Sequence, residues 1–459
     1  MTAKITLKEN DHINNPMIFS NDVKLDQVFE IQHQLIQVFS NGFSKLNSKG
    51  IETLKEINIA FSTSPLNTLI SEAITGLNNN QLTSSNFDLL AIVMASIDGS
   101  AYDSLFDELN KLMENQVSLI DNAKEINYTS NTEDHENFLE SIKSWLIDLA
   151  IMGFTEINMD VLESFEQVMD TLENIPELMR LNVILRGFIE EITTEIPITS
   201  QDEFPAKRWL GLWLRSYLLT MQLPKENVQS IKDCKLKIIG VQKYSHDYFT
   251  LYTFHGILDH EGNNRLIQIE AKKFTINEVS NNELLDLLNS THPELFKGLE
   301  ENLVIQVKQG MISGNYLILE KFKTTTTSFD IYETLAVLFE SKTISYNKQN
   351  PYNRHPLLLK YPVLCKIENI TKDGTSKFDW GDIPIRFDKV GTLNEKWKLA
   401  NSKGIFGFIQ FDNGWWISPV TILGDKNQYI GYTYSQDRSG KNVYEVLKER
   451  SNAILRSKS

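Results

Sequence analysis

The sequence has very little cysteine and no long apolar run. Only two of its 459 residues are cysteine, and both Cys234 and Cys365 lie in apolar, strand-like stretches. Two such thiols indicate a reducing compartment rather than a disulfide framework. The chain has no run of 18 apolar residues, and its start, MTAKITLKENDH, lacks the apolar segment of a signal peptide. We therefore expect a cytoplasmic protein that does not span a membrane.

Short catalytic motifs are also missing. The chain contains no GxxxxGK[ST], no GxGxxG after a strand, no HExxH, no CxxC and no GxSxG. His33 and His135 stand apart from other metal-ligand types, so we expect surface side chains there rather than ligands. Since many active sites assemble from scattered residues, these absences weaken an enzymatic interpretation without excluding it. The sequence predicts no cofactor and no metal.

Positive charge is scarce in the first part of the chain. Residues 1–200 hold 11 Lys and Arg against 31 Asp and Glu, whereas residues 201–459 hold 34 against 29. The excess of negative charge in residues 1–200 repels nucleic acid and favours basic protein surfaces. The small basic excess of the second part is too weak for a committed nucleic-acid surface. The charge pattern therefore favours other proteins as partners.

An apolar helix between Phe204 and Leu223 joins the two parts. Trp209, Trp213 and Tyr217 recur at helical spacing, and Pro205 suits the first turn. The residues before this helix have the 3.6-residue period of helices, and the residues after it have the two-residue period of strands. We therefore expect a multidomain α+β protein with an all-α first half.

The expected helices resemble stacked, repeat-like hairpins. Residues 89–113 and 146–174 each combine an all-apolar helix, a short turn and an amphipathic helix. Both an open solenoid and a compact bundle fit this pattern. The predicted organisation has five parts: a lead-in at 1–23, an acidic all-α domain at 24–223, an α+β domain at 232–342, a small β domain at 357–434, and a C-terminal helix and tail at 435–459.

The β-rich half offers two alternatives for residues 232–342. Three strands, a helix, a hairpin and a second helix fit either an OB-like barrel or another α+β arrangement, and we expect the latter. Later, Asp412-Asn413-Gly414 predicts a tight hairpin turn. The C-terminal modules are therefore expected to be β-rich and α+β.

Aromatic residues around this hairpin are the candidate interaction residues. The alternation of a strand puts Trp415 and Trp416 on opposite faces, so one indole should be partly exposed. Together with Trp380 and Phe408 they form either a stacking platform for a base or a partner side chain, or the core of a small domain.

A histidine-rich stretch gives the enzymatic alternative its residues. His246, His255 and Asp259 lie close together along the expected strands. Two of the neighbouring histidines fall in turns while His255 falls inside a strand, so the spacing does not place them on one face. A cryptic site near His246, His255 and Asp259 remains an alternative.

Two segments resemble a group of bacterial proteins. FSTSPLNTLISEAITG and the apolar helix after it, within Phe61–Ser96, and PAKRWLGLWLRSYLL at Pro205–Leu219 are similar to uncharacterised accessory proteins. Those proteins are encoded beside MoxR-type AAA+ ATPases, von Willebrand A-domain proteins and SWIM zinc-finger proteins. The resemblance implies an accessory or scaffold role with a MoxR-type AAA+ ATPase as partner, and it implies no site residue.

The sequence leaves three hypotheses for the function. The first is a non-enzymatic, cytoplasmic protein–protein interaction or scaffold protein. The second is a nucleic-acid-binding accessory protein that uses the aromatic β half. The third is an enzyme with the cryptic histidine site. Salt separates the first two, because phosphate binding weakens steeply as counterions compete.

Overall fold

The computed structural model describes residues 25–62, 67–120, 127–129, 133–172, 175–198, 204–221, 223–225, 228–245, 249–274, 293–349, 353–371, 374–386, 402–412, 414–424 and 428–429. Helices and strands are both abundant, so the protein is a multidomain α+β protein as predicted. The chain divides into two compact units. The first unit contains Met1–Leu105, Ala123–Glu226 and Pro351–Pro356, and the second contains Phe106–Asn122, Asn227–Asn350 and Leu357–Ser459.

The bounds of these two units are not those of the expected domains. Residues 106–122 fall in the second unit, and residues 351–356 fall in the first. The ranges 232–342 and 357–434 belong to one unit, because their sheets pack on each other. The predicted lead-in at 1–23 and the predicted helix at 435–459 lie outside the described residues.

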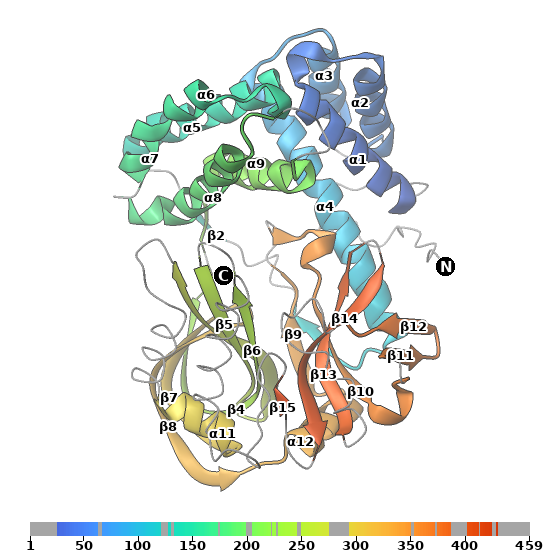
Figure 1. Ribbon diagram of the computed structural model, residues 1–459, viewed down its shortest axis with the longest axis vertical. Helices are drawn as coiled ribbons and strands as arrows, with labels where there is room; N and C mark the ends of the chain where they lie inside the picture. Colours follow the sequence, from blue (N-terminus) through green and yellow to red (C-terminus); the bar gives the residue numbers. More distant parts are fainter. Residues whose placement is uncertain are drawn as a thin grey trace. The chain divides into compact units, whose positions relative to one another are not determined.

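The helices of the first unit are drawn from blue to green in Figure 1. Their bounds are α1 Leu25–Asn41, α2 Ser48–Ala60, α3 Asn67–Asn78, α4 Ser84–Leu112, α5 Glu133–Met152, α6 Met159–Glu163, α7 Glu166–Leu172, α8 Met179–Glu195 and α9 Ala206–Met221. The helix α4 contributes to both units, because the division falls between Leu105 and Phe106. Two short strands, β2 Asn127–Thr129 and β3 Leu223–Lys225, pair antiparallel within the first unit.

Helix α9 is the core helix that the sequence predicts. Trp209, Trp213 and Tyr217 are fully buried on one side of it. The Trp213 indole contacts Phe39 of α1 at 4.6 Å between ring centroids and donates to the Leu146 carbonyl of α5 at 2.7 Å. Because α9 packs on α1, α5 and α8, the helices form a compact bundle around it.

The bundle contains an internal repeat with a period of 111 residues. Helix α1, the 3-10 turn Phe43–Lys45 and helix α2 correspond to α5, the 3-10 turn Phe154–Glu156 and helices α6 and α7. Each copy has a positive-φ glycine before its turn and an asparagine N-cap after it. The sequence signature is Gly-Phe-Ser-Lys-Leu-Asn at 42–47 and Gly-Phe-Thr-Glu-Ile-Asn at 153–158. In each copy a third helix, α3 or α8, then packs on the second.

The two copies meet at their glycines. A Cβ atom on Gly42 would lie 2.3 Å from the Met152 carbonyl oxygen, and one on Gly153 would lie 2.5 Å from the Asn41 carbonyl carbon. The hydroxyl groups after them bond reciprocally, Ser44 Oγ to the Ile151 carbonyl at 2.7 Å and Thr155 Oγ1 to the Ser40 carbonyl at 2.9 Å. Only glycine fits both the close approach and the backbone conformation. The two copies of the repeat therefore pack directly against each other at their glycine turns.

The repeat inferred from residues 89–113 and 146–174 is wrong. Helix α4 runs without a break through Asp98-Gly99-Ser100, where the sequence suggested a turn. Only the later copy is interrupted, at Gly153. By length and composition α4 is one helix that could cross a membrane, but 61% of its apolar window is buried inside the structure. Because most of this window is buried, the length and composition of α4 are weak evidence for a membrane span.

Five strands of the second unit close a barrel. Their bounds are β4 Val228–Ser245, β5 Phe249–His260, β6 Asn263–Phe274, β7 Leu303–Ser313 and β8 Tyr316–Ser328. The strands β4, β5 and β6 form a meander, β4 also pairs with β7, and β7 pairs with β8. The ring closes where Gln268 of β6 pairs in parallel with Tyr316 of β8. Helix α11, Pro293–Glu300, lies between β6 and β7 in the chain and packs on β4, β7 and β8.

This connectivity is that of an OB-type barrel. The structure therefore has the barrel alternative rather than the other α+β arrangement within residues 232–342. Residues 275–292 lie outside the described residues, so the helix expected between the three strands and the hairpin is described only from Pro293, where α11 begins. The second helix expected in this range is α12, Ile331–Glu340, and the Asp330 carboxylate caps it by accepting from the Glu333 N–H at 2.8 Å.

Three further sets of strands belong to the described part of the second unit. The barrel strand β6 also pairs with β9, Ile344–Asn347, which pairs with β1, Ser118–Ile120. A separate sheet has the order β10 Tyr361–Lys366, β13 Ser402–Phe411, β14 Trp415–Gly424 and β15 Gln428–Tyr429. A small hairpin consists of β11 Thr375–Phe378 and β12 Gly381–Pro384. The strands β9 to β15 are drawn in orange and red in Figure 1.

Candidate functional site

Of the four predicted interaction residues, Phe408 is buried and the other three lie in two β-hairpins. Phe408 is 1% exposed and contacts His255 and Tyr346, with ring centroids 5.2 and 6.0 Å away. Its side chain therefore belongs to the core between the barrel and the four-stranded sheet. Trp415 and Trp416 are both half-buried, so neither indole alone is the exposed one. Trp380 stacks on Phe378 within the β11–β12 hairpin, at 5.4 Å.

Each half-buried tryptophan has a local neighbour. Trp415 lies edge-to-face with Phe411 across the hairpin at 5.0 Å. The Arg386 guanidinium lies 5.7 Å from the centre of a Trp416 ring, a cation–π distance. Such contacts stabilise the hairpin and leave only part of each ring for a ligand. The role of Trp415, Trp416 and Trp380 in binding stays a prediction.

The face of the barrel that binds ligands in OB folds is covered by the chain itself. That face lies on the second and third strands, here β5 and β6. His255 of β5 packs on Phe408 of β13, and its partner in register, Gln268 of β6, is 4% exposed. Gln242 of β4 donates to the Pro419 carbonyl at 3.0 Å. The four-stranded sheet therefore occupies the surface on which an oligonucleotide would lie.

Gly240 permits this close packing of the two sheets. A Cβ atom there would lie 2.1 Å from Thr421 Oγ1 and 2.6 Å from Val420 Cγ1. The Thr421 hydroxyl donates to the Ile239 carbonyl at 2.7 Å in the same place. The four-stranded sheet is therefore tightly packed on the barrel.

His255 does not build the cryptic enzymatic site with Asp259. Both residues lie in β5, four positions apart, which is about 13 Å along an antiparallel strand. Burial lowers the pKa of His255 to about 3, and the nearby Lys360 charge acts in the same direction. Asp259 instead accepts from the Gly262 N–H at 3.0 Å in a turn. His246 lies outside the described residues.

In the described residues, neither the two cysteines nor the potential metal ligands form a candidate site. Cys234 and Cys365 are free and buried, as the sequence predicts. Burial raises the pKa of the Cys365 thiol to about 12, so it is not a ready nucleophile. Within the described residues, no group of three His, Cys, Asp or Glu side chains is arranged to hold a metal ion.

A polar cluster surrounds Asp98 on α4. The Gln32 amide donates to Asp98 Oδ1, and His355 Nε2 lies 3.9 Å from the same oxygen. In the two residues before His355, Asn353 accepts from Arg180 and Arg354 donates to Asp103, both at 2.7 Å. Burial raises the pKa of Asp98 to about 7, although its bond to Gln32 and the charges of Arg215 and Lys207 oppose the rise.

The space beside Asp98 is too small for a substrate. Two cavities of about 40 and 30 Å³ adjoin Asp98 and His355. Volumes of this size hold a few waters rather than an organic ligand. We therefore assign the cluster a structural role: it fastens residues 353–356 to the helices of the first unit.

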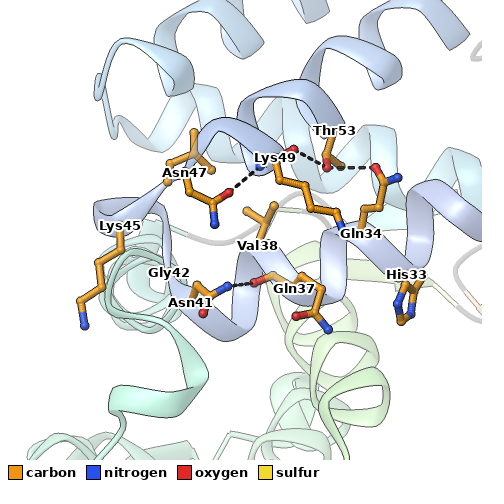
Figure 2. A pocket seen from close by; sticks show the side chains of 12 residues that line it. His33, Gln34, Gln37, Val38, Asn41, Gly42, Lys45, Asn47, Lys49 and Thr53 are labelled. Atoms are coloured by element: carbon orange, nitrogen blue, oxygen red, sulfur yellow. Dashed lines mark hydrogen bonds between the residues drawn. The ribbon is translucent and has the colours of Figure 1, made fainter.

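A larger basic pocket lies between α1 and α2 (Figure 2). Its volume is about 160 Å³. His33, Lys45 and Lys49 are among its twelve lining residues, and no aspartate or glutamate is. This composition is unusual in the part of the chain where acids outnumber bases by 31 to 11. The pocket is the candidate ligand site of the first unit.

The equivalent place in the second copy of the repeat is acidic and filled. With the 111-residue offset, Asp148, Glu156 and Asp160 stand where the first copy has Gln37, Lys45 and Lys49. Trp145 replaces Gln34, stacks on Phe165 at 4.2 Å and donates its indole N–H to the Val161 carbonyl at 3.3 Å. The side chain of Trp145 therefore fills the space that is open in the first copy.

The described surface of α5 to α8 is strongly acidic. Its exposed acidic residues are Glu140, Asp148, Glu156, Asp160, Glu163, Asp170, Glu177 and Glu195. The lysine and arginine residues of the same stretch turn inward: Lys143 is buried against Asp88 at 2.8 Å, and Arg180 and Arg186 are half-buried. Exposed Met159, at 40%, and Met179, at 46%, lie among these acids.

Exposed apolar residues also lie on strands β4 and β8 of the second unit. Val228 of β4 and Tyr316 of β8 lie in one row across Ser313 of β7, and Ile318 lies in the next row on the same face. Val228 is 47% exposed and Ile318 is 54% exposed. Sequence reasoning missed this surface because the bulges that set its register leave no local pattern.

No protein-family model matches the chain, and no curated protein matches it in sequence. The assignment of function therefore depends on the surfaces and pockets described above.

Sequence reasoning found the charge imbalance but missed the repeat that organises it. The signal was present, because Gly-Phe-Ser/Thr-x-Leu/Ile-Asn occurs at 42–47 and again at 153–158. The basic pocket was missed because its residues come from two helices and a turn, and only the fold brings them together.

Proposed function

We propose that this chain is a non-enzymatic, protein-binding accessory protein whose acidic helices capture a basic surface of another protein. The observation that carries this proposal is the acidic replacement within the repeat. At the positions around α5 and α6 where the first copy has Gln37, Lys45 and Lys49, the second has Asp148, Glu156 and Asp160. Asp148 is exposed, but partial desolvation by its neighbours raises the pKa of its carboxyl group, so a cationic partner would stabilise the charged form.

Exposed apolar side chains beside the acidic residues support the binding of a protein partner. Met159 precedes Asp160 on α6, and Met179 and Val183 lie one turn apart on α8. Flexible methionines beside acids suit a basic, amphipathic segment of a partner. Charge complementarity would steer that partner and set specificity, while the apolar contacts would contribute affinity.

The resemblance of Phe61–Ser96 and Pro205–Leu219 to accessory proteins encoded beside MoxR-type AAA+ ATPases gives the leading partner. In this chain the two segments are packing elements of the first unit, around α3, α4 and α9. A scaffold role for the ATPase is therefore the form of the proposal that we favour, with the cytoplasm as its location.

The covered barrel face supports a protein partner over nucleic acid. An OB barrel normally presents its second and third strands to a ligand. In this chain these strands are β5 and β6, and Phe408, Ser418 and Pro419 of the four-stranded sheet pack on that face of the barrel. The enzymatic alternative gains no support from the separation of His255 and Asp259.

Affinity capture from the native lysate with the full chain as bait tests the proposal. The variant carries Asp148→Gln and Asp160→Lys, which introduces the side chains that the first copy of the repeat holds at the same positions. A matched control carries Glu301→Gln and Glu320→Lys, exposed acids of the second unit. We expect one enriched protein, identified by mass spectrometry, to be lost with the variant and kept with the control.

Binding is then measured with the purified partner in place of the lysate. We expect the affinity to fall about tenfold or more in the variant, equal to ~1.4 kcal/mol, and to fall with added salt. A partner that binds the variant and the control alike would remove the acidic helices from the proposal.

A further inference from the structure

The pocket between α1 and α2 has a preformed floor. Gly50 lies so close to its neighbours that a Cβ atom would be 2.7 Å from Leu46 Cδ1 and 3.3 Å from Val38 Cγ2. The Asn47 side chain caps α2 by accepting from the Gly50 N–H at 2.9 Å. The glycine, the two apolar side chains and the cap thus fix the first turn of α2 against α1.

Polar side chains form the walls of the pocket. His33, Gln37 and Asn41 follow one another at four-residue spacing along α1, and Figure 2 shows them along one side of the opening. Gln34 is held in place, because its amide donates to Glu30 at 2.9 Å and its oxygen accepts from the Thr53 hydroxyl at 3.0 Å. The walls therefore present amide and imidazole groups in positions set by the helices.

Positive charge converges on this space from two sources. Lys49 is exposed in the first turn of α2, and Figure 2 shows its side chain extending toward Gln34. Backbone N–H groups of a first helical turn have no acceptor within the helix, and the helix dipole adds positive potential there. Lys45 points away in Figure 2 and pairs with Glu156 at 2.8 Å, so it contributes less.

We propose that the α1–α2 pocket binds the phosphate group of a small ligand. A phosphate has several acceptor oxygens, which can meet the Lys49 ammonium, the His33 imidazole and the Gln37 amide. The second copy of the repeat supports this assignment by contrast. There Asp160 replaces Lys49, Ser144 replaces His33 and Trp145 fills the space, so an anion site exists in one copy only.

Calorimetric titration of the full chain with inorganic phosphate tests the site. Glycerol phosphate in a second arm distinguishes a phosphomonoester from free phosphate, and acetate at equal ionic strength tests a simple carboxylate. We expect saturable phosphate binding with a Kd of about 1 mM or below. We expect acetate to bind at least about tenfold more weakly.

Substitutions of two lysines on α2 locate the binding. Lys49→Gln should weaken phosphate at least about tenfold, and Lys49→Asp, the residue of the second copy, should abolish saturation. Lys55→Gln is the control with the same change of charge, because Lys55 lies on α2 but does not line the pocket. Its effect should stay within about twofold.

A readout on the unaltered chain guards against misfolded variants. Phosphate should shift the backbone amide resonances of Ser48, Lys49 and Gly50 with one saturation curve. No saturable binding of either phosphate compound, or equal losses in Lys49→Gln and Lys55→Gln, would overturn the proposal. Neither result bears on the acidic helices, which are tested by partner capture.

Discussion

Asp98 is a carboxylic acid held in a place where its charge is costly. Its side chain is 17% exposed, on a core helix, with Gln32 and His355 as neighbours. Burial raises its pKa to about 7, and the bond to Gln32 and the charges of Arg215 and Lys207 lower it only in part. His355 shows the matching effect for a base, because burial and the same two charges lower its pKa to about 3.

The raised pKa predicts a specific pH dependence of stability. The folded state keeps the Asp98 proton up to a pH of about 7, whereas the unfolded chain loses it near the ordinary value of 3.8. Asp98 therefore contributes stability that is fully present below about pH 4 and is lost as the pH rises to 7. The loss amounts to as much as ~4 kcal/mol.

Urea unfolding of the wild type and of Asp98→Asn at several pH values checks this prediction. The difference between their free energies of unfolding should shift by the stated amount between pH 4 and 7, with the wild type favoured at low pH. His355 titrates in both proteins, so its opposite contribution to the pH dependence of stability cancels in the difference between their free energies of unfolding. A constant difference over this range would show that Asp98 is ionised in the folded protein, and Glu163→Gln serves as the exposed control.

At the scale of single residues, the sequence predicts which side chains are buried better than it predicts their neighbours and their roles. It predicted the buried thiols of Cys234 and Cys365, because apolar strand neighbours are local. It did not predict the environment of Asp98, because Gln32 and His355 are 66 and 257 positions away. It placed Phe408 among the interaction candidates, yet this ring is buried between sheets that only the tertiary fold brings together.

At the scale of elements, helices with a strong apolar stripe were predictable. Helix α9 has its predicted place and its predicted buried face of Trp209, Trp213 and Tyr217. The turn expected at Asp98-Gly99-Ser100 is absent, because the surrounding residues of α4 are buried and packing outweighs the helix penalty of one glycine. Barrel closure was not predictable, since it depends on the distant pair Gln268 and Tyr316.

Two glycine substitutions separate packing from helix propensity. Gly240→Ala places a methyl group 2.1 Å from Thr421 Oγ1, so we expect a loss of about 1–3 kcal/mol from overpacking. Gly187→Ala in α8 meets no atom within 4 Å, so it should stabilise the protein. The gain should be about 0.5–1 kcal/mol, through the entropy of the unfolded chain.

Denaturant midpoints of the two variants, followed by both circular dichroism and tryptophan fluorescence, measure these effects. A stabilising Gly240→Ala would show that the barrel and the four-stranded sheet are not tightly packed. In that case the β5–β6 face would be open to a ligand, and the nucleic-acid alternative would regain its strongest argument.

At the scale of the whole molecule, charge and fold divide the protein in the same way. The helical part carries nearly all of the negative excess, and its repeat confines the basic residues of the pocket to one copy. The sequence predicted this division of charge because it depends on composition alone. The distribution of charge between the two copies required the structure, since it depends on which residues are equivalent.

The central claim is that the intact protein binds a protein and not a nucleic acid. Fluorescence anisotropy with single- and double-stranded oligonucleotides near 150 mM salt, beside titration of the captured partner, tests it most directly. At this salt the Debye length is about 8 Å, so the weak basic excess of residues 201–459 cannot offset the acidic helices. We predict no oligonucleotide binding tighter than about 10 μM, and tighter, salt-sensitive binding of the partner. Submicromolar oligonucleotide binding with no enriched protein would contradict the claim.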